Sequence, residues 1–142
     1  MQITRREEYG LKGLIFLARQ PGEKVSLVSE ISRVEKIPGK FLAKIFQRLS
    51  KAGLLRSYRG SKGGFSLGRR ANEITMREVI EVLEGPVAIN RCLLHKGECD
   101  EESECSLHEV WEEAQHHMLK VLDRTTLEDL VKRIPNSKRG RR

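Results

Sequence analysis

The stretch PGKFLAKIFQRLSKAGLLRSYRGSKGGFSL, from Pro38 to Leu67, combines the pattern of a helix with that of a hairpin. Apolar residues recur at intervals of three and four, as on the buried face of a helix: Leu42, Ile45, Leu49 and Ala52. Basic residues recur at nearly the same interval on another face: Lys40, Lys44, Arg48 and Lys51. These cations have no acidic neighbours at helical spacing, unlike those of an ordinary solvated helix. The pattern predicts a helix from about Pro38 to Ala52 with a basic outer side.

Gly53 ends this helix, and the residues after it alternate as those of a strand do. The glycine-rich turn Gly60-Ser61-Lys62-Gly63-Gly64 leads into Phe65-Ser66-Leu67, which predicts a β-hairpin. Three basic residues lie on or beside its tip: Arg56, Arg59 and Lys62. A basic hairpin directly after a basic helix is typical of the wing of a winged helix, and its arginines suit phosphates or a narrow minor groove.

Two helices are expected before Pro38. Thr4 and Glu7 have the spacing of a capping box for a helix from about Arg5 to Arg19. Ser26 is expected to cap a short second helix that holds Leu27, Val28 and Ile31. Three helices followed by a hairpin predict a mainly α fold, a winged helix-turn-helix DNA-binding domain with a small β-hairpin wing.

The C-terminal half adds three further helices. Thr75 and Glu78 are expected to cap the first, which ends at Gly85-Pro86, and Thr125 and Glu128 the last. Between them, a long helix from about Ser106 to Arg124 carries a coiled-coil-like seam with spacings of four, three, four and three: Leu107, Trp111, Ala114, Met118 and Val121. Packing on its own domain is the alternative, but so narrow a seam favours a second copy of the chain. We therefore expect a C-terminal dimerisation helix and a homodimer.

These elements divide the chain into four expected regions. Residues 1–85 form the DNA-binding region, 86–105 the cysteine loop, 106–134 the dimerisation helix with the last short helix, and 135–142 a basic tail. The formal net charge of +7 is unevenly spread, because residues 1–70 hold 16 Lys and Arg against 5 Asp and Glu, whereas residues 71–134 hold 7 against 15. This uneven distribution of charge favours a polyanionic partner, double-stranded DNA, over a basic surface without a ligand.

All three cysteines lie in one acidic segment, RCLLHKGECDEESECSLH, from Arg91 to His108. Thiolates among carboxylates repel one another, so a bound cation is needed to hold them ionised. Six residues separate Cys92 from Cys99 and five separate Cys99 from Cys105, a longer reach than the two to four residues typical of a zinc knuckle. This spacing favours an iron–sulfur cluster, with zinc and redox-active or inert thiols as the alternatives.

Several classes of protein are disfavoured. No stretch approaches the length of a membrane span and the N-terminus lacks the apolar run of a signal peptide, so we expect a cytoplasmic protein without a membrane partner. The chain has no nucleotide-binding glycine motif, nucleophile triad or carboxylate pair, and Gly60–Gly64 precedes no helix and is not a P-loop. We expect no enzyme; the alternative function is a zinc- or cluster-dependent redox or hydrolytic enzyme.

Several motifs together resemble one family over nearly the whole chain. They are the start Met1-Gln2-Ile3-Thr4 with Tyr9, the helix end Leu49–Leu54, the wing Arg59–Gly64, the three cysteines and the segment Thr126–Val131. The chain resembles the iron–sulfur winged-helix regulators typified by IscR, NsrR and RirA, of the Rrf type. The resemblance implies a dimeric transcription factor whose DNA binding responds to a cluster, sensing iron–sulfur status, nitric oxide, iron or redox state.

The resemblance also implies residue roles. Cys92, Cys99 and Cys105 would be cluster ligands, Lys40, Ala43 and Lys44 would face the major groove, and Arg59 would enter the minor groove. Ala43 stands where IscR has an acidic residue, so the discrimination that IscR makes between promoters is not carried over. With the basic residues noted above, the expected DNA contacts are Lys40, Ala43, Lys44, Arg48, Lys51, Arg56, Arg59, Gly60 and Lys62.

Two residues are candidates for the fourth cluster ligand. IscR-like members use a histidine just after the third cysteine, here His108, and carry a [2Fe–2S] cluster. NsrR-like members take a carboxylate from the first helix of the other subunit, here Glu8, and carry a [4Fe–4S] cluster. We prefer Glu8, because Thr4 and Glu7 already provide the helix cap and leave Glu8 no local structural purpose.

Overall fold

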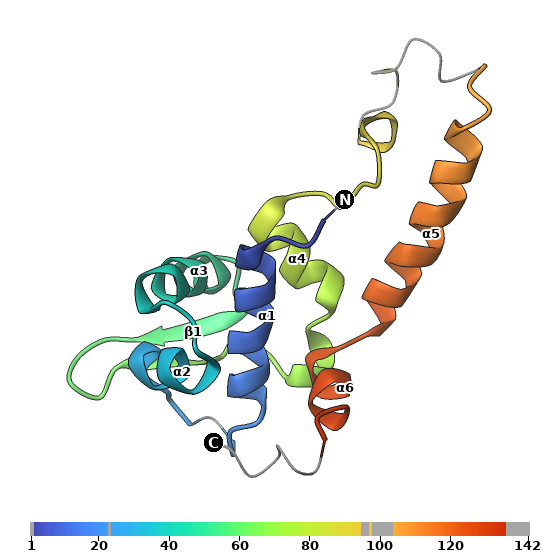
Figure 1. Cartoon of the computed structure of the whole chain (residues 1–142). Helices are drawn as coiled ribbons and strands as arrows, with labels where there is room; N and C mark the ends of the chain where they lie inside the picture. Colours follow the sequence, from blue (N-terminus) through green and yellow to red (C-terminus); the bar gives the residue numbers. More distant parts are fainter. Residues whose placement is uncertain (1, 23, 95–96, 98–103, 136–142) are drawn as a thin grey trace.

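The computed structural model describes residues 2–22, 24–94, 97 and 104–135, and they form a mainly helical fold with one small hairpin (Figure 1). In chain order the helices and strands are α1 (Arg5–Ala18), α2 (Val28–Glu35), α3 (Gly39–Lys51), β1 (Leu55–Tyr58), β2 (Gly64–Leu67), α4 (Met76–Glu84), α5 (His108–Arg124) and α6 (Leu127–Lys132). Two 3₁₀ turns complete the list: η1 (Ala71–Glu73) precedes α4, and η2 (Arg91–Leu93) begins the cysteine-rich segment. The winged helix-turn-helix predicted from the sequence is confirmed.

The start of α1 is built as predicted, but that of α2 is not. The Glu7 N–H donates to Thr4 Oγ1 at 3.2 Å and the Thr4 N–H donates to Glu7 Oε2 at 2.6 Å, which completes the capping box. The predicted cap at Ser26 is wrong, since Leu27 is the N-cap of α2 and no side chain caps it. Ser26 instead exchanges backbone hydrogen bonds of 2.9 and 2.8 Å with Phe65 of the wing. A bridge to a strand distant in sequence leaves no local signal at Ser26.

Helix α3 follows α2 after a tight turn at Lys36, whose left-handed φ of 56° ends α2. Its buried face holds Leu42, Ile45, Phe46 and Leu49. The expectation that Ala52 packs on this face is wrong, because Ala52 is the exposed C-cap and Gly53, with φ of 82°, ends the helix. The basic residues Arg48 and Lys51 lie in the last turn, where the helix dipole favours positive charge.

The predicted wing is an antiparallel pair in which Leu55 faces Leu67 and Tyr58 faces Gly64. Gly60, with φ of 97°, turns the chain at the tip, and its carbonyl accepts a 2.9 Å hydrogen bond from the Gly63 N–H. The close approach expected of the glycines occurs at Gly64, where a side chain would collide with the backbone of Ser26. Only Leu55 of β1 is buried, so the hairpin is anchored at its base and extends into solvent.

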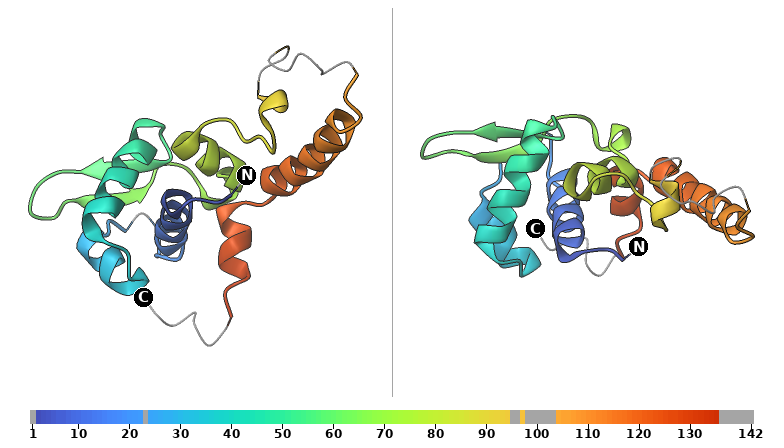
Figure 2. Two further views of the ribbon diagram at one scale, coloured as in Figure 1. Left: turned by 45° about the horizontal axis from the view of Figure 1, so that its top comes forward. Right: turned by 90° about the horizontal axis from the view of Figure 1, so that it is seen from above.

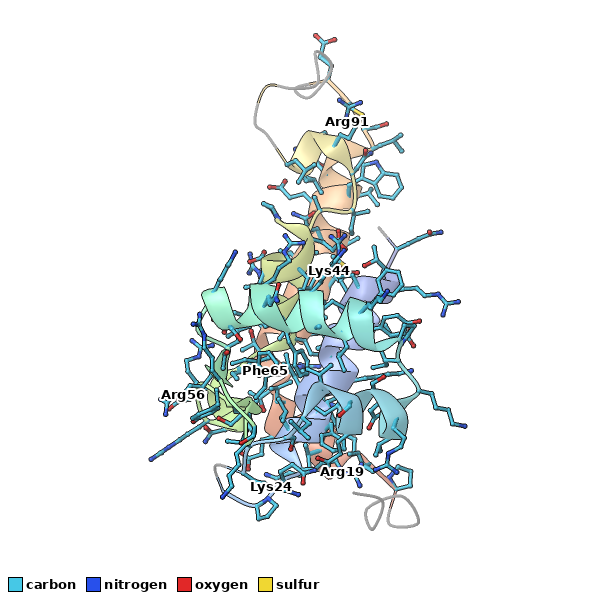
Figure 3. All side chains as sticks on the ribbon, turned by 90° about the vertical axis from the view of Figure 1, so that its left-hand side faces the viewer. Arg19, Lys24, Lys44, Arg56, Phe65 and Arg91 are labelled. Carbon is cyan, nitrogen blue, oxygen red and sulfur yellow. The ribbon has the colours of Figure 1, made fainter. Side chains whose placement is uncertain are left out.

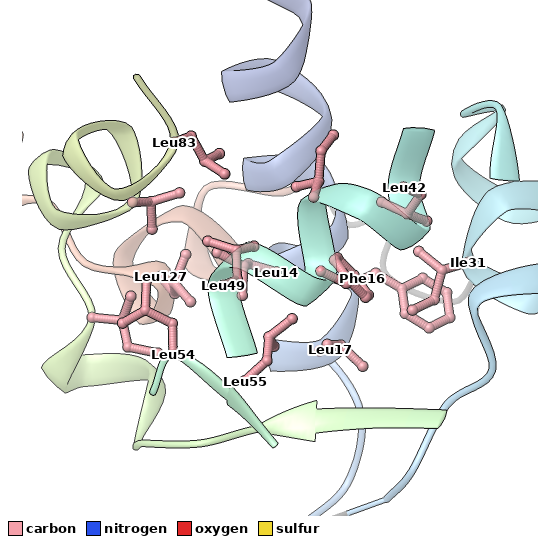
Figure 4. Packing of buried hydrophobic residues seen from close by; sticks show 14 of the residues in the cluster. Leu14, Phe16, Leu17, Ile31, Leu42, Leu49, Leu54, Leu55, Leu83 and Leu127 are labelled. Carbon is pink, nitrogen blue, oxygen red and sulfur yellow. The ribbon is translucent and has the colours of Figure 1, made fainter. Parts of the chain in front are cut away.

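The core lies where α1 meets α3, α4 and α6 (Figure 4). Leu14, Leu49, Leu83 and Leu127, one from each helix, are fully buried. Burying such a side chain stabilises the fold by about 1.5–3 kcal/mol. The chain returns to this core after α5, because the Leu127 N–H donates to the Ile74 carbonyl at 3.0 Å. The body of the fold therefore contains segments that precede α5 in the sequence and the segment that follows it.

Helix α5 stands apart from this body, at the end of the molecule opposite the wing (Figures 1 and 2). It begins at His108 and buries none of its residues. After it, Thr126 and Asp129 form the capping box of α6, so the predicted cap at Thr125 and Glu128 is wrong by one residue. Thr125 is buried instead, and its Oγ1 donates to the Val121 carbonyl at 2.7 Å. No helix among the described residues is long and apolar enough to cross a membrane.

Candidate nucleic-acid interface and cysteine segment

The outer side of α3 is basic and open to solvent. Its four cations are all exposed: Lys40, Lys44, Arg48 and Lys51. Ala43 lies half-buried among them. Figure 3 views the molecule from this side, with α3 across the middle of the face. The helix thus presents a positive surface that is not covered by any other described part of the chain.

The wing continues this positive surface. Arg56, Arg59 and Lys62 are exposed, as is Gly60 at the tip. Arg56 is visible on the hairpin beside α3 in Figure 3. Arg56 follows the buried Leu55 in β1, and because successive side chains of a strand alternate between its two faces, the arginine is exposed. The residues predicted to contact DNA therefore lie on one face of the molecule.

In the described part of the chain, the cations of this face lack the acidic partners that several cations elsewhere on the molecule have. Among the described residues, none of the seven cations on α3 and the wing forms an ion pair. Several cations on other surfaces are paired: Arg6 with Glu84, Lys12 with Glu8, Arg69 with Glu78, Arg77 with Glu81 and Asp123, and Lys132 with Glu128. Unpaired cations concentrated on one face attract an external polyanion.

A groove of about 640 Å³ borders this face, and the sequence patterns did not reveal it. It lies between α3, the start of α1 and the end of α4, and it is lined by Arg5, Tyr9, Phe41, Lys44, Arg48 and Glu84, among others. The Arg5 side chain donates to Tyr9 Oη at 3.3 Å, and this hydrogen bond raises the pKa of the guanidinium further above its ordinary value. The groove depends on how α1 packs across α3, which no local spacing encodes.

The described part of the cysteine segment contains two of the three thiols. Cys92 lies in η2, after Asn90, whose Oδ1 accepts a 2.7 Å hydrogen bond from the Arg91 N–H. Cys105 precedes α5, and both cysteines are half-buried. Cys99 lies outside the described residues, and within the described ranges no three His, Cys, Asp or Glu side chains are placed to hold a metal.

The two described ends of the segment are held by α5. The Ile89 N–H donates to Gln115 Oε1 at 3.0 Å, which ties the chain before η2 to the middle of α5. The His108 N–H donates to the Cys105 carbonyl at 3.3 Å, so His108 and Cys105 lie on one turn. Thiols and a half-buried imidazole at the base of one helix are a donor set that suits an iron–sulfur cluster.

Glu8 is exposed on α1 and has a local partner. Its Oε1 lies 3.2 Å from Lys12 Nζ, one turn later. The premise that Glu8 has no local structural purpose is therefore wrong. Exposed ion pairs of this kind contribute only about 0–1 kcal/mol, so the pair competes weakly with any other role. The choice between Glu8 and His108 stays a prediction.

The predicted seam of α5 is open in the single chain. Leu107 and Val110 are each 56% exposed and Val121 is 46% exposed, while Trp111 and Met118 are half-buried and Ala114 is exposed. The seam pattern did not include Val110, which widens the apolar stripe by one residue. Asp123 anchors the far end of α5, since its Oδ2 accepts a 2.9 Å hydrogen bond from Arg77 on α4. Helix α5 is thus bound to α4 near its C-terminal end, and its apolar stripe is exposed to solvent.

Comparison with known proteins gives concordant matches. A family model described as "Rrf2: Iron-dependent Transcriptional regulator" matches residues 3–133. A candidate HTH-type transcriptional regulator of Aquifex aeolicus is 37% identical over 125 residues, 87% of this chain and 86% of the relative. The structure of CymR, the global cysteine regulator of B. subtilis, is similar with a TM-score of 0.79 and 31% identity, covering 95% of this chain and 99% of CymR. IscR of T. potens is similar with a TM-score of 0.75 and 26% identity, covering 97% and 91% of the two chains.

Proposed function

The chain belongs to the Rrf2 family of transcriptional regulators, and from this premise we propose that it is a homodimer whose operator binding is controlled by an iron–sulfur cluster. Its relatives are DNA-binding regulators and not enzymes, so the alternative of a redox or hydrolytic enzyme is set aside. The single observation that supports the DNA face is the concentration of unpaired cations on α3 and the wing.

Docking follows from the arrangement of α3 and the wing. In a helix-turn-helix the second helix enters the major groove, so Lys40, Ala43 and Lys44 would face base edges and phosphates there. The wing extends from the same face, and Arg59 at its tip would reach a narrow minor groove, where the negative potential is strongest. Arg48, Lys51, Arg56 and Lys62, with the Gly60 backbone, would meet phosphates.

The dimer would form through α5. A single chain leaves Leu107, Val110 and Val121 largely exposed, and contiguous apolar surface of this kind marks a protein interface. A second copy offers the same stripe, so two α5 helices bury each other symmetrically. The two-fold axis would then require an approximately palindromic operator.

Arg59→Ala tests the DNA face. The variant should lose about 1–3 kcal/mol of operator binding, chiefly on sites with a narrow minor groove. If about four basic residues per subunit meet phosphate, the log–log salt slope of the wild-type dimer should be near −7. Fluorescence anisotropy over a salt series measures both quantities, with Arg124→Ala on α5 as the control. A slope near −1, or equal losses for the two variants, would refute the DNA face.

Cys92, Cys99 and Cys105 would hold the cluster, with Glu8 of the other subunit or His108 as the fourth ligand. When bound, an iron–sulfur cluster supplies a centre whose state depends on iron, redox conditions and small ligands. A contact between the start of α1 and the end of α4 borders the DNA face. Glu84, at the end of α4, accepts a 2.9 Å hydrogen bond from Thr4 Oγ1 and lies in the groove with Lys44 and Arg48.

Glu8→Ala and His108→Ala, made separately, test the ligand set. The preferred ligand predicts that Glu8→Ala changes the anaerobic absorption and Mössbauer spectra and the operator affinity, while His108→Ala leaves both close to wild type. The reverse result assigns the fourth position to His108. Purified protein that holds zinc or no metal, and whose DNA binding does not respond to iron and sulfide, contradicts the cluster and leaves the DNA face standing.

A further inference from the structure

Phe41 is the most exposed of the large hydrophobic side chains in the described structure. Its side chain is 63% exposed, although it lies on a helix that buries Leu42, Ile45, Phe46 and Leu49. An apolar ring left in water on a surface rich in lysine and arginine gains little from folding. The position of the ring therefore points to a partner outside the single chain.

The place of Phe41 in the fold narrows the kind of partner. It is the third residue of α3, in the first turn, between Lys40 and Lys44. Residues in the first turns of a recognition helix are the ones that contact base edges in the major groove. Phe41 also lies at the edge of the groove that holds Arg5, Lys44 and Arg48, cations placed to hold a phosphate backbone. If these cations hold the backbone, the ring lies within reach of the bases that the backbone carries.

We infer that Phe41 packs on the C5-methyl group of a thymine in each half-site of the operator and selects T at that position. Thymine is the base that presents an apolar group in the major groove, and phenylalanine has no polar atom with which to distinguish the other bases by hydrogen bonds. Burial of the methyl group against the ring supplies the discrimination. This inference rests on the DNA binding proposed above and adds a base-reading residue to it.

The experiment needs a duplex that the protein itself has chosen. Random duplexes are selected with the wild-type dimer, and in the preferred sequence each symmetry-related pair of thymines is replaced by deoxyuridine, which removes only the methyl group. Affinities are then measured for wild type, Phe41→Ala and Phe41→Leu. Leu27→Ala serves as the matched control, because Leu27 is an exposed apolar residue at the N-cap of α2.

One pair of thymines should account for the effect. When both thymines of this pair are replaced by deoxyuridine, the wild-type dimer should bind about tenfold more weakly, as expected for the loss of two buried methyl groups. Phe41→Ala should bind the thymine and deoxyuridine duplexes equally, Phe41→Leu should retain part of the difference, and Leu27→Ala should retain all of it.

The outcomes separate this inference from the proposed function. If Phe41→Ala keeps the full sensitivity to deoxyuridine, or wild type shows none, Phe41 does not read a methyl group although the protein binds DNA. A shift of Phe41→Ala from dimer to monomer in sedimentation would assign the ring to a protein interface and overturn the inference. Failure of the wild-type dimer to select any sequence would instead overturn the DNA binding itself.

Discussion

Helices α3 and α5 have similar amphipathic sequences but different surroundings. Within one chain α3 buries Leu42, Ile45, Phe46 and Leu49, whereas α5 buries no residue over 17 positions. An apolar stripe in the sequence predicts that one face of the helix is buried, but it does not predict whether the same chain or a second copy buries it. For α3 the cover comes from α1, α2 and α4 of the same chain, and for α5 we propose a second copy. The buried face of α3 therefore stabilises the single chain, whereas the open face of α5 would be buried only on association.

The largest expected effect is on the covered helix. Phe46→Ala removes a fully buried ring that packs edge-on against Phe65, with centroids 5.1 Å apart, and it should lower the free energy of unfolding by about 3–5 kcal/mol. Urea unfolding at two protein concentrations should show the same loss at both. Leu107→Ala on α5 is the comparison, and its loss should shrink toward zero as the protein is diluted and wild-type dimers dissociate, because Leu107 is exposed in the single chain. Equal, concentration-independent losses would contradict the contrast between the helices.

The next effect is on association. Trp111→Glu places a charge in the stripe of α5 and should yield a folded monomer, because the residue is only half-buried in the single chain. Without its partner each subunit reaches one half-site, so operator affinity should fall by about a hundredfold or more. Sedimentation velocity and anisotropy measure the two effects, and circular dichroism checks that the variant is folded. A variant that still sediments as a dimer would move the interface away from α5.

The winged helix was predictable because its signals are local. The alternation of apolar and basic residues on α3, the stop at Gly53 and the turn at Gly60 each lie within a few residues of what they determine. The predicted helix caps were wrong where the residue makes a contact that its neighbours in the sequence do not indicate. Ser26 resembles a helix cap but pairs with Phe65. Thr125 resembles one too, but it is buried and its Oγ1 donates to the Val121 carbonyl, so Thr126 caps α6.

For the cysteine segment, the chemistry stays a prediction. The spacing of Cys92, Cys99 and Cys105 favours a shared cluster, but the segment has few apolar residues, so the sequence offers no pattern from which to predict its geometry. Glu8 is a different kind of error, because Lys12 lies four residues later on the same predicted helix and their ion pair could have been predicted from that spacing. Phe41 was missed because an exposed apolar residue becomes visible only when the covered ones are known.

The smallest expected effect compares single charges on the two helices. Lys44 on α3 and Lys120 on α5 are both exposed, and neither forms an ion pair in the described part of the chain. If α3 meets phosphate and α5 does not, Lys44→Ala removes one contact per subunit, and the salt slope of the dimer should become shallower by about 2. Lys120→Ala should leave the slope unchanged, although it alters the net charge by the same amount. That equality of net charge makes the pair informative, since a general attraction between a basic protein and DNA predicts the same change for both. Anisotropy titrations from low to physiological salt distinguish the cases, and equal slopes for the two variants would mean that DNA senses the total charge and not the face of α3.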